Sequence, residues 1–334
     1  MNALVTGGAG FIGSHLTELL LGDGDEVFVL DDLSTGSLEN LDRVRRHPGL
    51  HAIVDSVLQP AIVNELVQKA EVVYHLAAAV GVKTIVEQPV RTLEVNLEGT
   101  RIVLDACCKF RRPVLVASTS EVYGDHRTQE PLREASSRRI YGVTTQKRWA
   151  YADSKAMDEF LALAYREEHG LDAVIVRLFN TVGPRQTGMY GMVVPRFVER
   201  ALRGDVIEIY GDGSQTRCFC HVADTVCALR DLMTDIGWTA GEIFNVGAPN
   251  QISIRELAER VKELTDSRSP TVHVPFEEVY GAGIDDMLHR VPCIDKVRTA
   301  IGWVPTRSLE EILRDVIDDV RARSSQRVYE EAIA

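Results

Sequence analysis

Long hydrophobic runs are missing from this chain. Its uninterrupted apolar segments, such as 76–80 and 173–176, are far shorter than the ~20 residues that a helix needs to cross a lipid bilayer. The amino terminus also lacks the basic region, apolar core and small-residue cleavage site of a secretory signal. We therefore expect a cytoplasmic protein that does not bind membranes.

Cysteine is scarce and positive charge is in the minority. Six cysteines in 334 residues do not make a disulfide framework, and in the cytoplasm we expect reduced thiols. Cys218, Cys220 and His221 lie close together, but strand alternation explains them without a metal, so no metal site is expected. With 49 acidic and 37 basic side chains the net charge is −12, which disfavours nucleic-acid binding. An anionic substrate has to be held by local basic side chains and backbone N–H groups.

What the chain does contain is an alternation of strand-like and helical segments. Strands are expected at 3–6, 26–30, 51–54, 72–76, 114–117 and 173–178, and helices at 11–21, 90–110 and 150–169. Strands with near-continuous apolar runs are typical of a parallel sheet that is covered on both faces. The pattern predicts an α/β fold, a Rossmann-type doubly wound parallel sheet.

Shorter, turn-rich segments replace this alternation from about residue 181. We expect a Rossmann domain over 1–180 and a smaller α/β domain mainly over 181–323, with some segments returning to the first domain. An amphipathic helix over 309–322 closes the smaller domain. Residues 324–334 are expected to form a frayed tail.

A glycine-rich loop, residues 6–13, joins the first predicted strand to the first predicted helix. Glycines allow positive φ angles and let backbone N–H groups approach a pyrophosphate at the positive end of the helix. Asp31 ends the next strand, 18 residues after Gly13, where a carboxylate can accept hydrogen bonds from an adenosine ribose. The same charge repels a 2′-phosphate, so NAD is favoured over NADP.

Tyr151 and Lys155 stand at i and i+4 in a predicted helix, so their side chains share one face. Free tyrosine and lysine have pKa values near ~10 and ~10.4 and are poor bases at neutral pH. A neighbouring ammonium and an oxidised nicotinamide favour phenolate, which makes the pair a general base. Because Tyr-x-x-x-Lys also arises by chance, it is informative here only together with the glycine loop.

In these features the chain resembles an extended short-chain dehydrogenase/reductase of the NAD-dependent sugar epimerase/dehydratase family, over essentially its whole length. The residues that carry the resemblance are 6–13, Asp31, 75–78, Asn96, 118–124, Tyr151 with Lys155, 177–180, 183–185 and 213–217. The resemblance implies bound NAD, a UDP-sugar in the cleft between two domains, and a homodimer formed by the helices near 93–110 and 150–168.

The resemblance also assigns the site residues. The cofactor is expected at Gly7, Gly10, Phe11, Ile12, Gly13, Asp31, Asp32, Asp55, Leu76, Ala77, Ala78, Asn96, Tyr151 and Lys155. The nucleotide sugar is expected at Ser120, Asn180, Arg185, Val194, Tyr210, Arg217 and Arg290. Arginine suits a diphosphate because it is always charged and donates in two directions. Thr119 is expected to help Tyr151 at the sugar 4-OH.

Two further residues indicate a subgroup of the family. Sugar 4,6-dehydratases usually carry an Asp-Glu pair directly after the catalytic Thr, whereas Thr119 is followed here by Ser120 and Glu121. This run, the segment 147–151 and the pair His289-Arg290 resemble UDP-glucuronate decarboxylases, in which the matching Glu and Arg flank the substrate carboxylate. Glu121 and Arg290 therefore join Thr119, Tyr151 and Lys155 as expected catalytic residues.

The chemistry of a uronate suits this set. Oxidation of C4 places a ketone β to the C6 carboxylate, so CO₂ can leave into an enolate that nearby positive charge and hydrogen-bond donors stabilise. We expect conversion of UDP-glucuronic acid to UDP-xylose, UDP-4-keto-xylose or both. A UDP-sugar 4-epimerase acting on UDP-glucuronate or UDP-glucose is the main alternative. A non-catalytic NAD-binding regulator is a weaker one, because Thr119, Tyr151 and Lys155 are all present.

Overall fold

The computed structural model describes residues 1–81, 85, 87–126, 130–188, 192–275, 278–279, 287 and 289–333. Within a helix, the side chains of 147–148 and 326–333 lie outside this description. The basic pair Lys147-Arg148, which contributes to the resemblance, is therefore described by its backbone alone.

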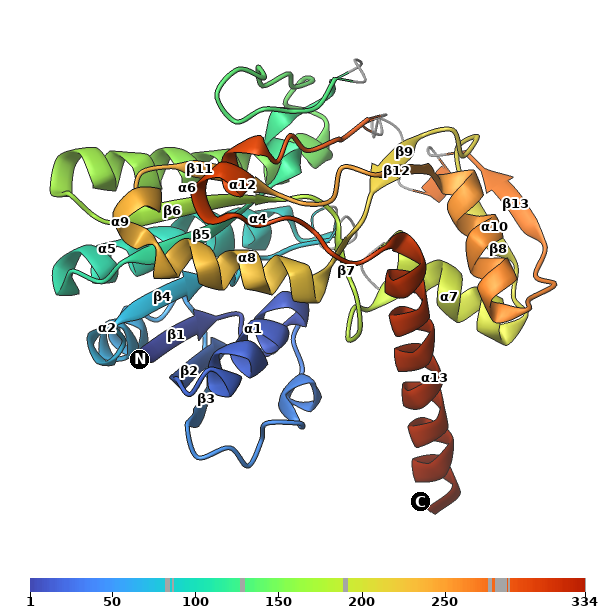
Figure 1. Cartoon of the computed structure of the whole chain (residues 1–334), viewed down its shortest axis with the longest axis horizontal. Coiled ribbons are helices and arrows are strands. Elements are labelled where there is room, and N and C mark those ends of the chain that lie inside the picture. Colours follow the sequence, from blue (N-terminus) through green and yellow to red (C-terminus); the bar gives the residue numbers. More distant parts are fainter. Residues whose placement is uncertain are drawn as a thin grey trace.

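Seven parallel strands form the central sheet (Figure 1), in the order β11-β6-β5-β4-β1-β2-β3. Their bounds are β1 Asn2–Thr6, β2 Glu26–Asp31, β3 Leu50–Val54, β4 Val72–His75, β5 Val114–Thr119, β6 Ala173–Leu178 and β11 Ile243–Val246. The strand order reverses between β1 and β4, which is where doubly wound sheets bind their ligands. The predicted fold is confirmed.

Helices cover both faces of the sheet. One layer contains α1 (Phe11–Gly22), α8 (Val222–Thr234) and α12 (Asp295–Ile301), and the other contains α2 (Pro60–Lys69), α5 (Gly99–Phe110) and α6 (Lys147–His169). Alternate residues of β1 show why both layers are needed, because Ala3 and Val5 pack on the first layer and Leu4 packs on the second. The apolar runs of the strands are thus buried on both sides.

The helix predicted over 90–110 is interrupted in the structure. It consists of α4 (Pro89–Leu93), a π-helical turn η2 (Glu94–Glu98) and α5. Such turns frequently lie at functional sites. This one contains Asn96, whose side chain contacts the backbone of Ala79 and the hydroxyl of Ser154.

A second core lies beyond the sheet, among α7 (Val193–Arg203), α10 (Ile254–Thr265) and α13 (Leu309–Ile333). Short strand pairs complete this part: β7 (Thr181–Val182) with β10 (Cys220–His221), β8 (Ile207–Tyr210) with β13 (Thr271–Val274), and β9 (Thr216–Cys218) with β12 (Gln251–Ser253). The remaining short helices are η1 (Leu38–Leu41), η3 (Ser120–Tyr123) and α9 (Ile236–Thr239). Three elements of this later part of the sequence, α8, β11 and α12, return to the central sheet. The two parts are therefore interleaved in the sequence, and the domain limits at 180 and 323 stay a prediction.

The carboxyl-terminal segment differs from the expected frayed tail. Helix α13 continues to Ile333, and Figure 1 shows it extending away from the rest of the molecule. No glycine or proline occurs between Leu309 and Ile333 to stop the helix. An ion pair of 2.7 Å between Arg323 and Asp319 supports its middle.

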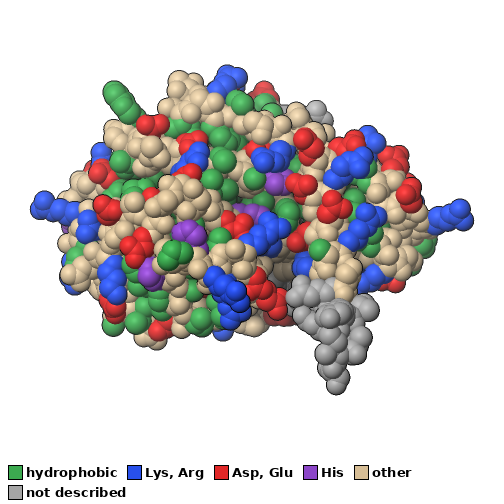
Figure 2. Space-filling view, turned by 60° about the horizontal axis from the view of Figure 1, so that its bottom comes forward, with side chains coloured by type: hydrophobic (Ala, Val, Ile, Leu, Met, Phe, Trp, Pro, Cys, Tyr) green, Lys and Arg blue, Asp and Glu red, His purple; other side chains and the backbone are tan. Residues whose placement is uncertain are grey.

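The surface carries charge of both signs. Figure 2 shows acidic and basic side chains interspersed over the face in view, without a continuous basic area. None of the described helices is long and apolar enough to span a membrane.

Candidate active site

A cavity of about 910 Å³ opens at the carboxyl ends of the parallel strands. It is at the upper end of the roughly 300–1,000 Å³ found for small-molecule sites. Of the predicted site residues it brings together Gly7, Gly10, Phe11, Ile12, Gly13, Asp31, Asp32, Asp55, Leu76, Ala77, Ala78, Thr119, Ser120, Glu121, Tyr151, Lys155, Asn180, Val194, Tyr210, Arg217 and Arg290. The two that do not line it are Asn96 and Arg185.

The glycine loop forms one end of this cavity. Gly7 has φ +72°, which favours glycine, and a Cβ on Gly13 would lie 2.0 Å from the carbonyl oxygen of Gly7. Gly10 caps α1, whose amino end therefore faces the cavity. The close turn and the helix end together present backbone N–H groups to an anion.

Asp31 ends β2 beside this loop and is 9% exposed. Its carboxylate accepts hydrogen bonds from the backbone N–H groups of Ala9 (3.0 Å) and Leu33 (2.9 Å). Burial raises the pKa of Asp31, while these hydrogen bonds act in the opposite direction. The carboxylate is held in place by the loop and retains lone pairs for a further donor.

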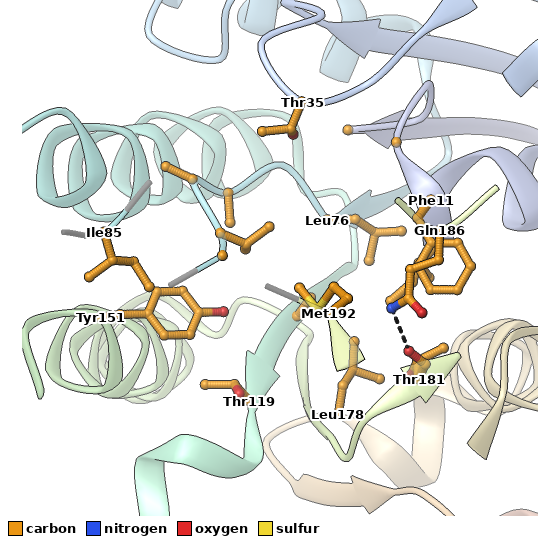
Figure 3. A pocket seen from close by; sticks show the side chains of 18 of the residues that line it. Phe11, Thr35, Leu76, Ile85, Thr119, Tyr151, Leu178, Thr181, Gln186 and Met192 are labelled. Atoms are coloured by element: carbon orange, nitrogen blue, oxygen red, sulfur yellow. Dashed lines mark hydrogen bonds between the residues drawn. The ribbon is translucent and has the colours of Figure 1, made fainter. Parts of the chain in front are cut away.

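Tyr151 and Thr119 face each other across part of the cavity (Figure 3), from α6 and from the end of β5. Removal from water raises the pKa of Tyr151 above its ordinary value, and the negative charges of Glu121 and Asp158 act in the same direction. A hydrogen bond with Thr119 opposes this rise. Burial and the neighbouring negative charges thus favour the phenol form of Tyr151, and added positive charge favours the phenolate.

Lys155 lies one helical turn after Tyr151, as the spacing predicts, and is 3% exposed. Its Nζ donates to Asp158 Oδ2 at 2.7 Å. The Asp158 carboxylate at its side offsets part of the positive charge that Lys155 presents to Tyr151.

Glu121 and Arg290 meet at the cavity although 169 positions separate them in the chain. Arg290 Nη1 lies 3.4 Å from Glu121 Oε1 and 3.4 Å from Ser120 Oγ, and its Nη2 lies 3.4 Å from Asn180 Oδ1. Arg290 is 8% exposed. These long contacts are weak hydrogen bonds, and they place the guanidinium among three polar groups at the cavity.

A buried polar cluster holds the end of β5 against α6. Glu159 accepts from Ser118 Oγ at 2.5 Å and from Arg177 Nε and Nη2 at 2.9 and 2.7 Å. Ser118 directly precedes Thr119, and Glu159 belongs to the same helix as Tyr151. The cluster therefore fixes the hydroxyl groups of Thr119 and Tyr151 relative to each other.

Two predicted ligand contacts differ from the structure. Asn96 is buried behind the cavity wall and accepts from the N–H of Ala79 at 2.8 Å. Arg185 pairs with Glu18 of α1 and donates to Ser14 Oγ at 3.1 Å. Both side chains are committed to polar groups of the protein, so they support the wall rather than line it.

Arg196 is a cavity residue that the sequence did not indicate. Its guanidinium carbon lies 3.8 Å from the centroid of the Tyr210 ring, so the two form a flat cationic surface. The position of Arg196 in the first turns of an amphipathic helix gives no local sign of this contact, because Tyr210 belongs to a separate strand.

With this geometry in place, a comparison with known proteins identifies the family. The model of the GDP-mannose 4,6-dehydratase family matches residues 4–316. The chain belongs to this family. This family consists of NAD-dependent sugar epimerases and dehydratases. The resemblance that the sequence motifs indicate is therefore confirmed.

Relatives within the GDP-mannose 4,6-dehydratase family have several activities. A Bacillus cytotoxicus protein named UDP-N-acetyl-alpha-D-glucosaminuronate decarboxylase is 42% identical over 94% of this chain and 96% of its own length. UDP-glucuronic acid decarboxylase 6 of Arabidopsis thaliana is 37% identical over 97% of this chain and 90% of its own. The crystal structure of a Thermus thermophilus UDP-glucose 4-epimerase with NAD has a TM-score of 0.83 and 31% identity, and covers 96% of this chain and 99% of that one.

In this member of the family, the cysteine and histidine cluster near β10 has a structural explanation. His221 Nδ1 accepts from the N–H of Ala223 and caps α8 at 3.0 Å, while Nε2 lies 3.1 Å from Asp315. Among the described residues, no group of three or more His, Cys, Asp and Glu side chains could hold a metal ion.

Proposed function

We propose that this protein is an NAD-dependent decarboxylase of UDP-linked uronic acids, with UDP-glucuronate as its substrate. The observation that carries the proposal is the Glu121–Arg290 pair of 3.4 Å, placed in the cavity that Thr119 and Tyr151 also line. The decarboxylase names of the Bacillus and Arabidopsis relatives support it.

The cavity residues fit NAD. The turn at Gly7 and the crowded position of Gly13 leave room only for backbone, the amino end of α1 favours a pyrophosphate, and Asp31 offers a carboxylate to a ribose. When bound, NAD would supply the acceptor for the hydride of sugar C4 and a positive charge that favours the phenolate of Tyr151.

The side chains then divide the proton chemistry among them. Tyr151 removes the proton of the sugar 4-OH, and Thr119 holds the phenolic oxygen through its hydroxyl. After CO₂ has left, the protonated Tyr151 donates a hydrogen bond to the enolate oxygen at C4. The same group thus serves oxidation, enolate stabilisation and re-reduction.

Glu121 and Arg290 act on the carboxylate end of the sugar. Arg290 binds the C6 carboxylate through a charge-assisted pair. Glu121, or a water molecule that it orders, delivers a proton to C5 once CO₂ is gone. An epimerase has to keep the same carboxylate, which is why this pair favours decarboxylation over the epimerase alternative.

A second substrate is favoured by one observation. The relative named for UDP-N-acetyl-alpha-D-glucosaminuronate is 42% identical, compared with 37% for the Arabidopsis protein named for UDP-glucuronate. The two sugars differ at C2 and share the C4 hydroxyl and C6 carboxylate on which the proposed residues act. The same mechanism therefore applies to both.

We also propose a cytoplasmic homodimer formed by the helices near 93–110 and 150–168, as the resemblance implies, and extend its interface to α4, which directly precedes the first of them. Four large apolar side chains are exposed on α4 and α6, namely Val90 (68%), Leu93 (36%), Met157 (49%) and Phe160 (56%). The helices contact each other, so the four residues belong to one region. Burying such a region is favourable by roughly 25 cal/mol per Å² of apolar area.

The test is an incubation of purified protein with UDP-glucuronate or UDP-N-acetylglucosaminuronate, with and without added NAD. We expect CO₂ release, with UDP-xylose or UDP-4-keto-xylose detected by mass spectrometry and proton NMR for the first substrate. A larger kcat/KM for UDP-N-acetylglucosaminuronate than for UDP-glucuronate would show that the acetylated sugar is the preferred substrate. Unchanged mass with UDP-galacturonate as product would contradict decarboxylation and establish the epimerase alternative.

Tyr151→Phe is the matched control for this assay. Its ring is retained and only the reacting hydroxyl is lost, so NAD binding is expected to persist while C4 oxidation falls by at least roughly 10²-fold, the usual contribution of a general base. Substantial turnover of this variant would remove Tyr151 from its proposed role.

A further inference from the structure

A chain of buried polar side chains runs from the end of β1 to Lys155. Thr6 Oγ1 lies 2.8 Å from His75 Nδ1, and His75 Nε2 lies 3.0 Å from Thr100 Oγ1. The Thr100 hydroxyl acts to lower the pKa of Asp158, and Asp158 Oδ2 accepts a hydrogen bond from Lys155 Nζ at 2.7 Å. None of the five side chains is more than 3% exposed.

The carboxylate of Asp158 sets the direction of every bond in this chain. Paired with the Lys155 ammonium, it can only accept, so the proton of the Thr100 hydroxyl is directed toward it. Thr100 then accepts from Nε2–H of His75, which burial keeps neutral by lowering its pKa to about 3. Nδ1 of this tautomer is an acceptor, and Thr6 donates to it.

The far end of the chain reaches the cavity. Thr6 Oγ1 accepts from the backbone N–H of Ala77 at 3.3 Å, and Ala77 lines the cavity. Thr6 itself is the last residue of β1, immediately before the glycine loop. The chain thus connects Lys155 in α6 to both backbone segments that border the proposed NAD site.

Stability alone does not explain the Asp158–Lys155 pair. Both side chains are withdrawn from water, and Asp158 Oδ1 is buried with no hydrogen-bond partner among the residues that the structure describes. Buried ion pairs often contribute no more to stability than well-packed apolar residues would. A carboxylate kept half-satisfied beside the proposed catalytic lysine points to a role in the reaction.

We propose that Asp158 is a positioning residue that aims the Lys155 ammonium at the cavity and is itself held by the Thr100–His75–Thr6 chain. Lys155 has three N–H donors, and Asp158 takes one, which fixes the direction of the other two. The inference rests on the proposed function, because it takes Lys155 and Tyr151 to act on a bound sugar and cofactor.

Asp158 also acts on Tyr151 through its charge. The charged groups around Tyr151 are Glu121 from η3, Arg290 from the 289–290 segment, and Asp158 and Lys155 from its own helix. Asp158 and Glu121 raise the pKa of Tyr151, whereas Arg290 lowers it. Replacing the Asp158 carboxylate by a neutral amide lowers the pKa of Tyr151, so the acidic limb of the rate profile moves to lower pH.

The decisive variant is Asp158→Asn, which keeps the shape of the side chain and removes its charge. The readout is the rate at which bound NAD is reduced on mixing with UDP-glucuronate, measured as a function of pH. We expect a loss of roughly 10- to 100-fold in this rate at its optimum, as for a misaligned reacting group, with the acidic limb displaced to lower pH. The KM for the sugar is expected to stay unchanged.

The matched control is Asp153→Asn on the same helix. Asp153 is 48% exposed and pairs with Arg139 at 3.4 Å, so its loss should change neither the rate nor the pH profile. An Asp158→Asn variant with the wild-type rate, or with a uniform loss at every pH, would overturn the proposal. Thermal unfolding of each variant identifies misfolding, and NAD affinity measured by calorimetry gives a readout independent of turnover.

His75→Gln tests whether the buried polar side chains Thr6, His75 and Thr100 act through Asp158. If His75 acts through Asp158, the double variant loses little more than the worse single variant, whereas independent residues give additive losses. Additive losses would remove the Thr100–His75–Thr6 chain from the proposal.

NAD reduction precedes CO₂ release, so failure of the proposed function appears as NAD reduction without CO₂ in the wild type. Failure of this inference appears as unaltered NAD reduction in Asp158→Asn.

Discussion

Glu121 and Arg290 separate the two halves of the proposed reaction. We expect Glu121→Gln and Arg290→Ala to slow CO₂ release by roughly 10²-fold or more, since Arg290 holds the carboxylate that leaves and Glu121 delivers the proton to C5 after it has left. NAD reduction should slow much less. Stopped-flow detection of NADH together with trapped CO₂ measures the two steps separately.

The control for these variants is Arg133→Ala. Arg133 and Asp295 also form a pair of 3.4 Å, but both side chains are more than half exposed, so its loss should leave both steps unchanged, as for surface pairs in general. If Glu121→Gln and Arg290→Ala slow both steps equally, these residues bind the sugar and take no part in CO₂ release.

The site residues that could be predicted are those that a sequence motif identifies. Tyr151 and Lys155 are placed by helical spacing, and Glu121 and Arg290 by resemblance to a family. Arg185 could not be placed in this way, because a guanidinium suits a phosphate and a carboxylate equally well. Whether it meets a ligand or Glu18 depends on how α1 packs, which is a property of the tertiary structure.

The turn from β1 into α1 depends on the absence of a side chain at Gly13. An alanine Cβ there would lie 2.0 Å from the carbonyl oxygen of Gly7, so the loop has to shift, at a cost of about 1–3 kcal/mol for overpacking. We expect Gly13→Ala to lower the unfolding temperature and to weaken NAD binding. Calorimetry of NAD binding and thermal unfolding measure the two effects.

Gly22→Ala is the matched control in the same helix. A Cβ at Gly22 has nothing within 4 Å, and alanine favours helix over glycine by up to about 1 kcal/mol. Its stability should stay equal or rise slightly, with NAD binding unchanged. Equal behaviour of the two variants would show that the close approach at Gly13 does not matter.

Elements with strong periodicity were predicted closely, while their interruptions were not. The predicted strand over 173–178 coincides with β6. The π turn at Glu94–Glu98 interrupts a segment whose apolar pattern continues through it. It lies where Asn96 contacts Ala79 and Ser154, residues from elsewhere in the chain, so the helix period alone could not indicate it.

The parallel sheet follows from the order of elements, because βα alternation leaves few topologies. The return of β11 to the edge of that sheet does not, since four residues, Ile243–Val246, carry too little pattern to show which strand they join. Its pairing with β6 places α8 beside α1, and this arrangement brings the second part of the chain over the cavity. Long-range pairing of this kind is set by packing of the whole chain.

The proposed dimer is a property of the whole molecule, and Phe160 is its best probe. Phe160 is 56% exposed on α6, and a carboxylate in its place would take a charge into the proposed interface, which is unfavourable. We expect the wild type to sediment as a dimer and Phe160→Glu as a monomer. Trp238→Glu is the control, because Trp238 is 88% exposed and belongs to α9, which is not one of the helices of the proposed interface. A Phe160→Glu variant that stays dimeric, or a monomeric wild type, would exclude this interface and leave the exposed apolar side chains of α4 and α6 to be explained by another partner.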